Sequence, residues 1–343
     1  MVSEMLIYLL SFFLSFIAVY GMRRFCLWKG IMDVPNTRSS HVNPTARIGG
    51  VGFIVAYIAS LALWGDVSIL FCKMLAIAVG VSILSLMDDL KGLKPSIRFL
   101  VHILFSVGIF VLGIKLIGIS MPFVEMRFAT MAFQIVISVF FLAAMTNVYN
   151  FMDGIDGYAG GVGILGALSL AGFAQIAGKV AIVEALLMLA AVLAGFWVWN
   201  YPKAKIFMGD VGSAFLGFYF GAVILYLTLI NADFLLPMLM VFGVFIGDAS
   251  VTMVRRLINR EKIWEAHRSH FYQRLTIIGW SHRRVIWLEF AHMAMCCMLA
   301  FGYLAVSETG RLVVLSVFLL TFVVKFSYIT FLERPDRISH EAR

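Results

Sequence analysis

Residues 128–178 have the sequence FATMAFQIVISVFFLAAMTNVYNFMDGIDGYAGGVGILGALSLAGFAQIAG. Two apolar runs, 128–146 and 158–178, each approach the roughly 20 residues that an α-helix needs to cross a bilayer. Between them lies the polar, glycine-containing segment 147–157. This pattern predicts a hairpin of two membrane helices. The polar residues that could bind a ligand or act in catalysis lie at the turn between them.

The composition extends this pattern to the whole chain. Of 343 residues, 62% are hydrophobic and 13% are charged, whereas soluble domains carry roughly 25% charged residues. The net charge of +8 does not indicate nucleic acid, because the basic residues fall in short loops where membrane topology explains them. We therefore predict an all-α polytopic membrane protein with a single integral-membrane domain over residues 1–343.

Eleven apolar runs are candidate spanning helices. They are 5–22, 48–64, 68–87, 98–119, 128–146, 158–178, 180–199, 213–230, 234–254, 286–306 and 309–331. With an outer N-terminus, 21 of the 27 lysines and arginines fall on the inner side. The positive-inside rule then predicts an outer N-terminus and a cytoplasmic C-terminus in a bacterial inner membrane.

Most of the clustered acids fall on the same inner side, where we expect the active-site face. Its predicted cytoplasmic loops are 23–47, 88–97, 147–157, 200–212 and 255–285. Acids in the outer loops are scattered, so we interpret them as solvated turn residues.

The motif DDLK closes the run 68–87 and contains Asp88, Asp89 and Lys91. Adjacent carboxylates at the end of an apolar run are costly unless they are paired or hydrated. They suit Mg²⁺, which takes oxygen ligands together with substrate phosphates, and one of them could act as a general base. Lys91 could hold a phosphate as a point charge. A polar helix stop is the alternative interpretation.

The segment NVYNFMDGIDG places Asn147, Asn150, Asp153 and Asp156 three residues apart. This spacing stacks polar groups along one side of a helix end, and the two glycines permit a turn and close backbone approach to a ligand. An asparagine- and glycine-rich hairpin turn is the alternative. Four evenly spaced polar groups favour a binding site.

Asp210 and Ser213 open the run 213–230 within FMGDVGS. Both are typical helix N-caps, and a carboxylate near a helix N-terminus is ordinary. Beside the other two acidic clusters, metal ligation becomes the better interpretation of Asp210.

EAHRSH, residues 265–270, lies in the longest predicted cytoplasmic loop. If this stretch is helical, His267 and His270 share a face with room for an anion, and Arg268 adds a charge-assisted bond to a diphosphate. A zinc site lacks a nearby third ligand. A basic amphipathic segment on anionic lipid is also compatible with the sequence.

Two further features carry polar groups. The first loop, DVPNTRSSHVNPTARIGG over 33–50, contains Arg38, His41 and Arg47, which could bind phosphate. Asp248 lies within the apolar run 234–254. An intramembrane carboxylate suggests a functional site, and a polar pair with a neighbouring helix is the alternative.

The four clusters DDLK, NVYNFMDGIDG, FMGDVGS and EAHRSH, with the first loop, resemble those of the polyprenyl-phosphate N-acetylhexosamine-1-phosphate transferases (glycosyltransferase family 4). The resemblance covers nearly the whole chain, with five motifs in order. It implies transfer of a sugar 1-phosphate from a UDP-N-acetyl sugar to undecaprenyl phosphate at the cytoplasmic face of the membrane, with release of UMP.

The resemblance also implies residue roles and a cofactor. Asp88 and Asp89 match aspartates associated with activating the lipid phosphate or with metal, and Asp210 matches a Mg²⁺ ligand. The remaining expected substrate or metal contacts are Lys91, Asn147, Asn150, Asp153, Asp156, His267, Arg268, His270, Arg38 and His41. We expect Mg²⁺, with Mn²⁺ able to substitute, and Asn150 as its second ligand.

His-Arg-Ser-His departs from the triple-histidine run of the peptidoglycan branch. This departure favours the branch that initiates O-antigen and other surface polysaccharides, with phospho-MurNAc-pentapeptide transfer as the alternative. A transporter or flippase with a cytoplasmic acidic site is a rival from another class. The sequence leaves open a homodimer and the identity of the N-acetyl sugar.

Overall fold

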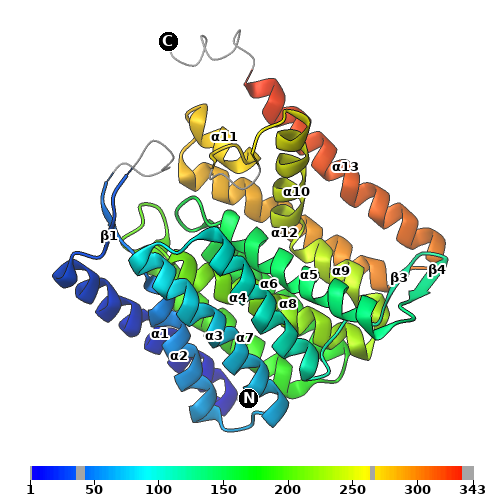
Figure 1. The fold of residues 1–343 in the computed structure, drawn as a ribbon, viewed down its shortest axis with the longest axis horizontal. Coiled ribbons are helices and arrows are strands. Elements are labelled where there is room, and N and C mark those ends of the chain that lie inside the picture. The colour runs from blue at the N-terminus through cyan, green and yellow to red at the C-terminus, as the bar shows by residue number, and fades with distance from the viewer. Residues whose placement is uncertain (1, 36–42, 263–266, 334–343) are drawn as a thin grey trace.

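A computed structural model describes residues 2–35, 43–262 and 267–333 (Figure 1). The long helices are α1 (Val2–Lys29), α2 (Gly49–Trp64), α3 (Ile69–Lys91), α4 (Pro95–Val111), α5 (Met131–Phe151), α6 (Tyr158–Ile176), α7 (Val180–Asn200), α8 (Gly209–Ile230), α10 (Gly243–Ile258), α12 (His282–Leu304) and α13 (Glu308–Leu332). Shorter helices are η1 (Ala232–Phe234), α9 (Leu235–Val241) and α11 (Phe271–Ile277). Each of the eleven predicted runs overlaps at least one of these helices.

The architecture is that of an all-α polytopic membrane protein. Eight described helices are long and apolar enough to cross a membrane, and the bent pair α9–α10 would make up to nine. The helices α2 and α4 are apolar but have only 16 and 17 residues. The predicted number of eleven spans therefore stays a prediction.

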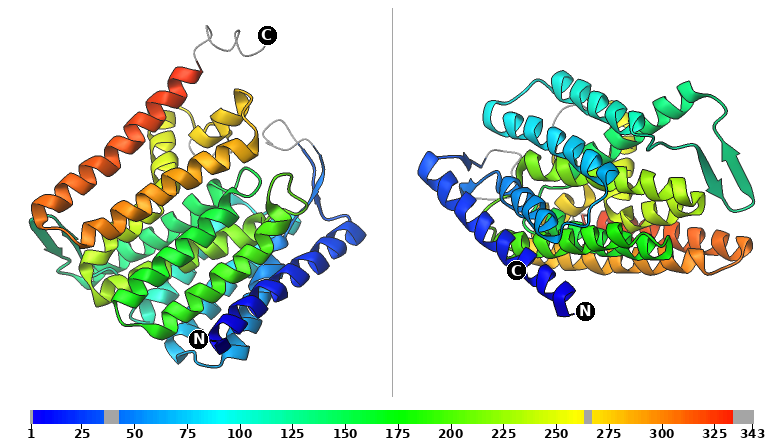
Figure 2. Two further views of the ribbon diagram at one scale, coloured as in Figure 1. Left: turned by 180° about the vertical axis from the view of Figure 1, so that it is seen from behind. Right: turned by 90° about the horizontal axis from the view of Figure 1, so that it is seen from below.

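Helix α8 forms the centre of the bundle and packs against α2, α3 and α5. In its most apolar stretch 83% of the residues are buried, compared with 17% in α1 and α13. Figure 2 shows α1 and α13 on opposite sides of the bundle, with α6 and α7 between them. Their exposed apolar faces suit contact with lipid chains.

Two of the predicted spanning helices are not continuous straight helices. The run 98–119 is helical only to Val111, because Gly113 adopts a left-handed φ of 86° and the chain then forms a hairpin. Its strands are β3 (Gly118–Met121) and β4 (Val124–Arg127). The run 234–254 is bent by 77° between α9 and α10. Gly243 lies at this bend and packs beneath the ring of Phe318 of α13.

The predicted cytoplasmic loops were too long, because helices continue past the apolar runs. Residues 23–29 are the last turns of α1, and residues 147–151 are the last turn of α5. Polar side chains at these ends reach water while the backbone keeps its helical hydrogen bonds. The long loop 255–285 is likewise interrupted by α11 and by the start of α12.

A second small sheet lies at the opposite end of the bundle from the β3–β4 hairpin (Figure 1). Strand β1 (Met32–Asp33) pairs with β2 (Thr45–Ala46) in antiparallel register. The Phe207 amide donates to the Ala46 carbonyl at 2.8 Å, so this sheet is tied to the segment before α8. The first loop and the start of α8 therefore lie together.

Close helix packing at Gly217 is directly testable. A Cβ added there would lie 2.6 Å from the Met145 carbonyl oxygen and 2.8 Å from Thr146 Cα of α5. We expect Gly217→Ala to destabilise the protein by about 1–3 kcal/mol, because backbone atoms cannot yield as a flexible side chain does. Thermal unfolding in detergent measures the effect.

Gly302→Ala is the matched control, since no atom lies within 4 Å of an added Cβ at that helical position. Its melting temperature should stay the same or rise, because alanine favours a helix over glycine. Equal melting temperatures for both variants would contradict close α5–α8 packing.

Candidate active site

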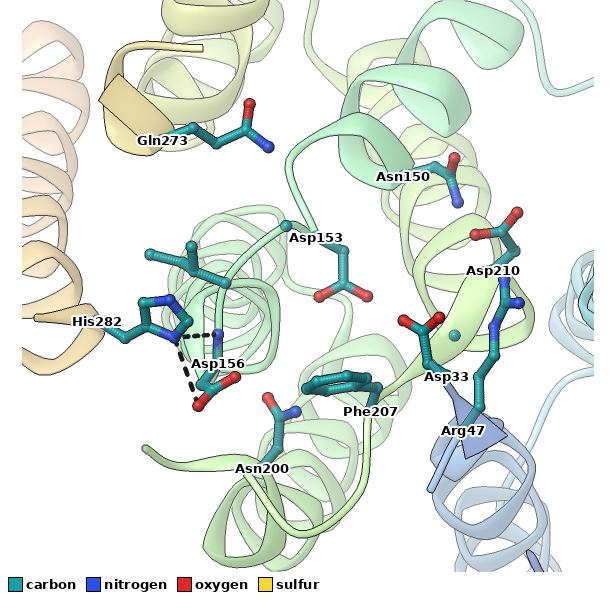
Figure 3. Close-up of a pocket in the computed structure, with 13 residues that line it drawn as sticks. Asp33, Arg47, Asn150, Asp153, Asp156, Asn200, Phe207, Asp210, Gln273 and His282 are labelled. Atoms are coloured by element: carbon teal, nitrogen blue, oxygen red, sulfur yellow. Dashed lines mark hydrogen bonds and ion pairs between the residues drawn. The ribbon is translucent and has the colours of Figure 1, made fainter. Parts of the chain in front are cut away.

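A cavity of about 220 Å³ opens where α5, α7 and α8 meet the first loop (Figure 3). Its wall is formed by Asp33, Arg47, Asn150, Asp153, Gly154, Ile155, Asp156, Asn200, Phe207, Gly209, Asp210, Gln273 and His282. Four carboxylates and an arginine in one small space make the cavity strongly polar. Such a cavity at the end of a membrane bundle is a candidate site for a charged ligand.

Asp89 caps the N-terminus of α8 from the neighbouring helix α3. Its carboxylate accepts hydrogen bonds from the backbone amides of Asp210 at 3.1 Å and Val211 at 2.9 Å. Arg47 Nη2 lies 2.6 Å from Asp89 Oδ1, and the Asp89 side chain is fully buried. The first amides of a helix lack intrahelical partners, so this carboxylate both satisfies and fixes the start of α8.

Arg98, near the start of α4, joins two of the predicted catalytic aspartates. Its Nη1 lies 2.7 Å from Asp88 Oδ2 and 3.3 Å from Asp210 Oδ2. The other Asp88 oxygen accepts the Leu93 amide at 2.6 Å. Asp88 is therefore engaged by two donors, whereas Asp210 lies on the cavity wall.

Asp153 is the carboxylate with the fewest partners in this cluster. It follows α5, and its side chain points into the cavity in Figure 3. Its carboxylate makes no hydrogen bond or ion pair with a residue in the described part of the chain. Burial, together with the charges of Asp210 and Asp89, raises the pKa of Asp153 to about 7.

Arg47 supplies positive charge to the cavity. Burial alone would lower the pKa of its guanidinium, but nearby carboxylates, Asp89 first among them, outweigh burial and raise it. Arg47 stays charged under all physiological conditions. Its cation partly offsets the acids without cancelling them, since four aspartates line the same wall.

The opposite wall is held by Asn200 at the end of α7. Its Oδ1 accepts from the Gly157 amide and its Nδ2 donates to the Ile206 carbonyl, both at 3.0 Å. Asp156 accepts from the Ala204 amide at 3.0 Å and lies 3.4 Å from His282 Nδ1. These contacts fix the loop after α5 against the loop before α8.

The histidine motif has a different environment from the predicted one. Residues 267–270 precede α11 and are not helical, so the predicted helical face with room for an anion was wrong. His270 is buried, and its Nδ1 lies 3.2 Å from Asp248 Oδ1. Burial, followed by the neighbouring His270, lowers the pKa of His267 to about 4. His267 is therefore neutral at pH 7.

Asp248 organises the start of α11. Its two oxygens accept from the amides of Phe271 at 2.9 Å and Tyr272 at 3.0 Å, and Oδ1 accepts from Thr252 Oγ1 at 3.0 Å. The interpretation as a polar pair with a neighbouring segment therefore fits this fully buried residue better than a separate site.

Apart from the two histidines, the predicted site residues divide into four groups. Asn150, Asp153, Asp156 and Asp210 line the cavity, and Asp88 and Asp89 lie directly behind it. Lys91 is exposed, Asn147 donates to the Ala143 carbonyl, and Arg268 donates to Thr276, so none of these lines the cavity. Arg38 and His41 lie outside the described residues.

Several cavity residues escaped the sequence analysis. They are Asp33, Asn200, Phe207, Gln273 and His282, with Arg98 behind the wall. Phe207 was quoted only as part of FMGDVGS, whereas Arg47 was predicted from the first loop as a possible phosphate ligand and does line the cavity. These residues lie in or beside the predicted cytoplasmic loops, which was a sequence signal for a place at the active-site face. Many other residues lie in the same loops, so this signal did not single them out.

A preformed metal cage is not present among residues 2–35, 43–262 and 267–333, because no three histidine, cysteine or acidic side chains group closely enough. Oxygen donors nevertheless converge. Asn150 Nδ2 donates to Ser213 at 2.9 Å and the Asn150 side chain hydrogen-bonds Asp210, while Asp153 faces the same space. This donor set fits a hard divalent cation whose shell is completed by substrate phosphates and water.

Fold and cavity together define a multi-pass membrane protein with a charged site at one end of its bundle. Residues 71–228 match the family described as glycosyl transferase family 4. A probable undecaprenyl-phosphate N-acetylglucosaminyl 1-phosphate transferase of Bacillus subtilis is 28% identical over 268 residues, covering 76% of this chain and 74% of the relative.

Two other relatives extend the comparison. An undecaprenyl-phosphate alpha-N-acetylglucosaminyl 1-phosphate transferase of Yersinia pestis is 24% identical and covers 94% of this chain and 90% of the relative. A phospho-N-acetylmuramoyl-pentapeptide-transferase of Chlorobium chlorochromatii is 30% identical over about half of each chain (49% and 50%). The family match and these relatives confirm the resemblance of the chain to the polyprenyl-phosphate N-acetylhexosamine-1-phosphate transferase superfamily.

The raised pKa of Asp153 predicts a pH-dependent stability. Between its ordinary value of about 3.9 and about 7, the folded protein retains a proton that the unfolded chain releases. The stability contributed by this proton is complete below the lower value and is lost as the pH rises through 7. Asp153→Asn should therefore raise the melting temperature more at pH 8 than at pH 5.

Thermal unfolding in detergent with EDTA, at both pH values, measures this difference. Asp66→Asn, in the exposed loop between α2 and α3, is the control and should change neither melting temperature. The same gain for Asp153→Asn at both pH values would contradict the raised pKa.

Proposed function

We propose that this chain transfers an N-acetylhexosamine 1-phosphate from a UDP-linked sugar to undecaprenyl phosphate, releasing UMP. Relatives named as polyprenyl-phosphate N-acetylglucosamine-1-phosphate transferases support this reaction class. The observation that carries the proposal is the convergence of Asp153, Asp210 and Arg47 on one cavity. A diphosphate donor needs this combination of a cation-binding acid pair and a fixed positive charge.

Mg²⁺, with Mn²⁺ as a substitute, is the proposed cofactor. Asp210 and Asn150 would hold it, with the unpaired Asp153 facing the same space. Bound there, the ion would neutralise charge on the donor diphosphate and on the leaving UMP. Asp210 would exchange its contact with Arg98 for the ion, and the released guanidinium could then pair with a substrate phosphate.

The cavity offers different chemistry along its length. Phe207 presents an aromatic ring beside Asn200 and Asp156, which suits a nucleobase. Arg47 and Asp210 lie at the other end, where the diphosphate would sit. An oxygen of the lipid phosphate then attacks the β-phosphorus of the donor, and the bond from that phosphorus to the bridging oxygen breaks as UMP leaves.

This attack needs no strong general base. A phosphate monoester has a second pKa of about 6, so the acceptor is already largely ionised at neutral pH. Asp88 and Asp89 each accept from two or more protein donors. We propose that they position Arg98 and the start of α8, and that catalysis rests on orientation and charge neutralisation.

The proposed location is a bacterial inner membrane with the site on the cytoplasmic face. The inward bias of lysine and arginine supports an outer N-terminus and an inner C-terminus. In this orientation the cavity faces the compartment that holds nucleotide sugars. The acceptor lipid would reach it from the adjoining bilayer leaflet.

Within the superfamily we propose the branch that initiates lipid-linked surface polysaccharide such as the O-antigen of lipopolysaccharide. The sequence His-Arg-Ser-His at 267–270 supports this choice over the triple-histidine branch. The second candidate is phospho-MurNAc-pentapeptide transfer, which the 30% identical relative favours. The donor distinguishes the two.

The proposal predicts UMP release that depends on lipid and on Mg²⁺. Purified protein in detergent would receive undecaprenyl phosphate and a panel of UDP-N-acetyl sugars that includes UDP-MurNAc-pentapeptide. Release with one N-acetylhexosamine donor, and its loss in EDTA, is the expected result. Asp210→Asn should lower the rate by at least about 100-fold, the scale of removing a charge-stabilising group.

Asp66→Asn is again the matched control and should retain full activity, since this exposed residue lies outside the cavity. Release with the pentapeptide donor alone would establish the second candidate. Well-folded protein that releases UMP from no donor would overturn the transferase proposal and favour a transporter. Full activity of Asp210→Asn would remove the metal assignment.

A further inference from the structure

Gln273 is a cavity residue in which only one of the two polar side-chain atoms has a hydrogen-bond partner among the described residues. It lies in the first turn of α11, is 6% exposed, and lines the cavity. Its Oε1 accepts the His270 amide at 3.4 Å, whereas its Nε2 donates to no described residue. Figure 3 shows this amide projecting from α11 toward Asp153.

The fold makes room for this amide. A Cβ added at Gly154 would lie 2.8 Å from Gln273 Nε2 and 2.2 Å from the hydroxyl oxygen of Tyr272. Asp248 fixes the start of α11 by accepting hydrogen bonds from the amides of Phe271 and Tyr272, the two residues directly before Gln273. The buried Gln273 amide is therefore held in place beside the Asp153–Gly154 turn.

The other cavity groups are a poor match for a neutral carbonyl. Asp33, Asp153 and Asp156 are carboxylates, which accept hydrogen bonds from sugar hydroxyls but cannot donate when ionised. The two cavity asparagines each already direct Nδ2 to a protein acceptor, and Arg47 pairs with Asp89. An acetamido carbonyl can only accept, and Gln273 Nε2 is a neutral donor with no acceptor among the described residues.

We infer that Gln273 is a specificity-determining residue that donates a hydrogen bond from Nε2 to the 2-acetamido carbonyl of the donor sugar. This inference rests on the proposed function, because it assumes a UDP-N-acetyl sugar in the cavity. A buried donor left without a partner is costly. A sugar with a hydroxyl at C2 is too short to replace the acetamido carbonyl, so Gln273 would discriminate against it.

The test uses Gln273→Met, which keeps the side-chain length and removes the amide. For the N-acetyl donor that is most active with the wild type, kcat/KM should fall about tenfold, the effect of one neutral hydrogen bond. The inhibition constants of UDP and of the matching UDP-hexose with a C2 hydroxyl should change less than about twofold. Only the N-acetyl donor makes the proposed contact.

Two further variants separate this role from a structural one. Gln134→Met is the matched control, since the Gln134 Nε2 donates to the Phe128 carbonyl near the β3–β4 hairpin; it should leave all three constants unchanged. Gln273→Glu keeps an oxygen for the His270 amide but has no N–H, so it should lose at least as much kcat/KM for the N-acetyl donor as Gln273→Met.

Equal losses for the N-acetyl donor, UDP and the UDP-hexose would overturn the inference, because they would report general damage to the cavity. Unchanged kcat/KM in Gln273→Met would also overturn it. These outcomes differ from failure of the proposed function, in which the wild type itself releases UMP from no donor.

Discussion

The position of the site depends on the contacts of one buried carboxylate, that of Asp89. It lies on α3 but satisfies the first amides of α8, and its charge is matched by Arg47 from the first loop. Three segments far apart in the chain therefore meet at one side chain. Because a buried charge without partners is very costly, this arrangement fixes the position of Asp210 at the start of α8.

The electrostatics of the cavity follow from this arrangement. Asp88 and Asp89 accept hydrogen bonds from protein donors, whereas the Asp153 carboxylate has no such donor among the described residues. Burial, together with the charges of Asp210 and Asp89, raises the pKa of Asp153 to about 7. The aspartates in and behind the cavity outnumber Arg47 and Arg98. A divalent cation would offset this excess negative charge and could then hold an anionic substrate, which is why the Asp153 carboxylate suggests phosphoryl transfer rather than a structural ion pair.

The membrane explains why the site lies at one end. In lipid the backbone must remain helical, so irregular segments with exposed amides occur where helices leave the hydrocarbon. The loops before α6 and α8 are such segments, and they carry Asp153, Asp156 and Phe207. The same constraint accounts for the interlocked hydrogen bonds of Asn200, which hold two of these loops together.

The sequence by itself determined the class of fold, because hydropathy and helix length are local properties. Each of the eleven apolar runs overlaps a helix. Asn150, Asp153 and Asp156 line one cavity, but α5 ends at Phe151, so the predicted stacking along one side of a helix does not include the two aspartates. Hydropathy could not reveal the break at Phe242, since α9 and α10 together are apolar enough to cross a membrane.

Only the tertiary structure decided which partner each polar side chain has. His270 binds Asp248 rather than an anion, Asp89 caps a helix more than 100 residues away, and Gln273 reaches the cavity from α11. The physical reason is that a hydrogen bond needs atoms within about 3 Å. That proximity arises from packing between distant segments, and the order of residues in one chain does not specify it.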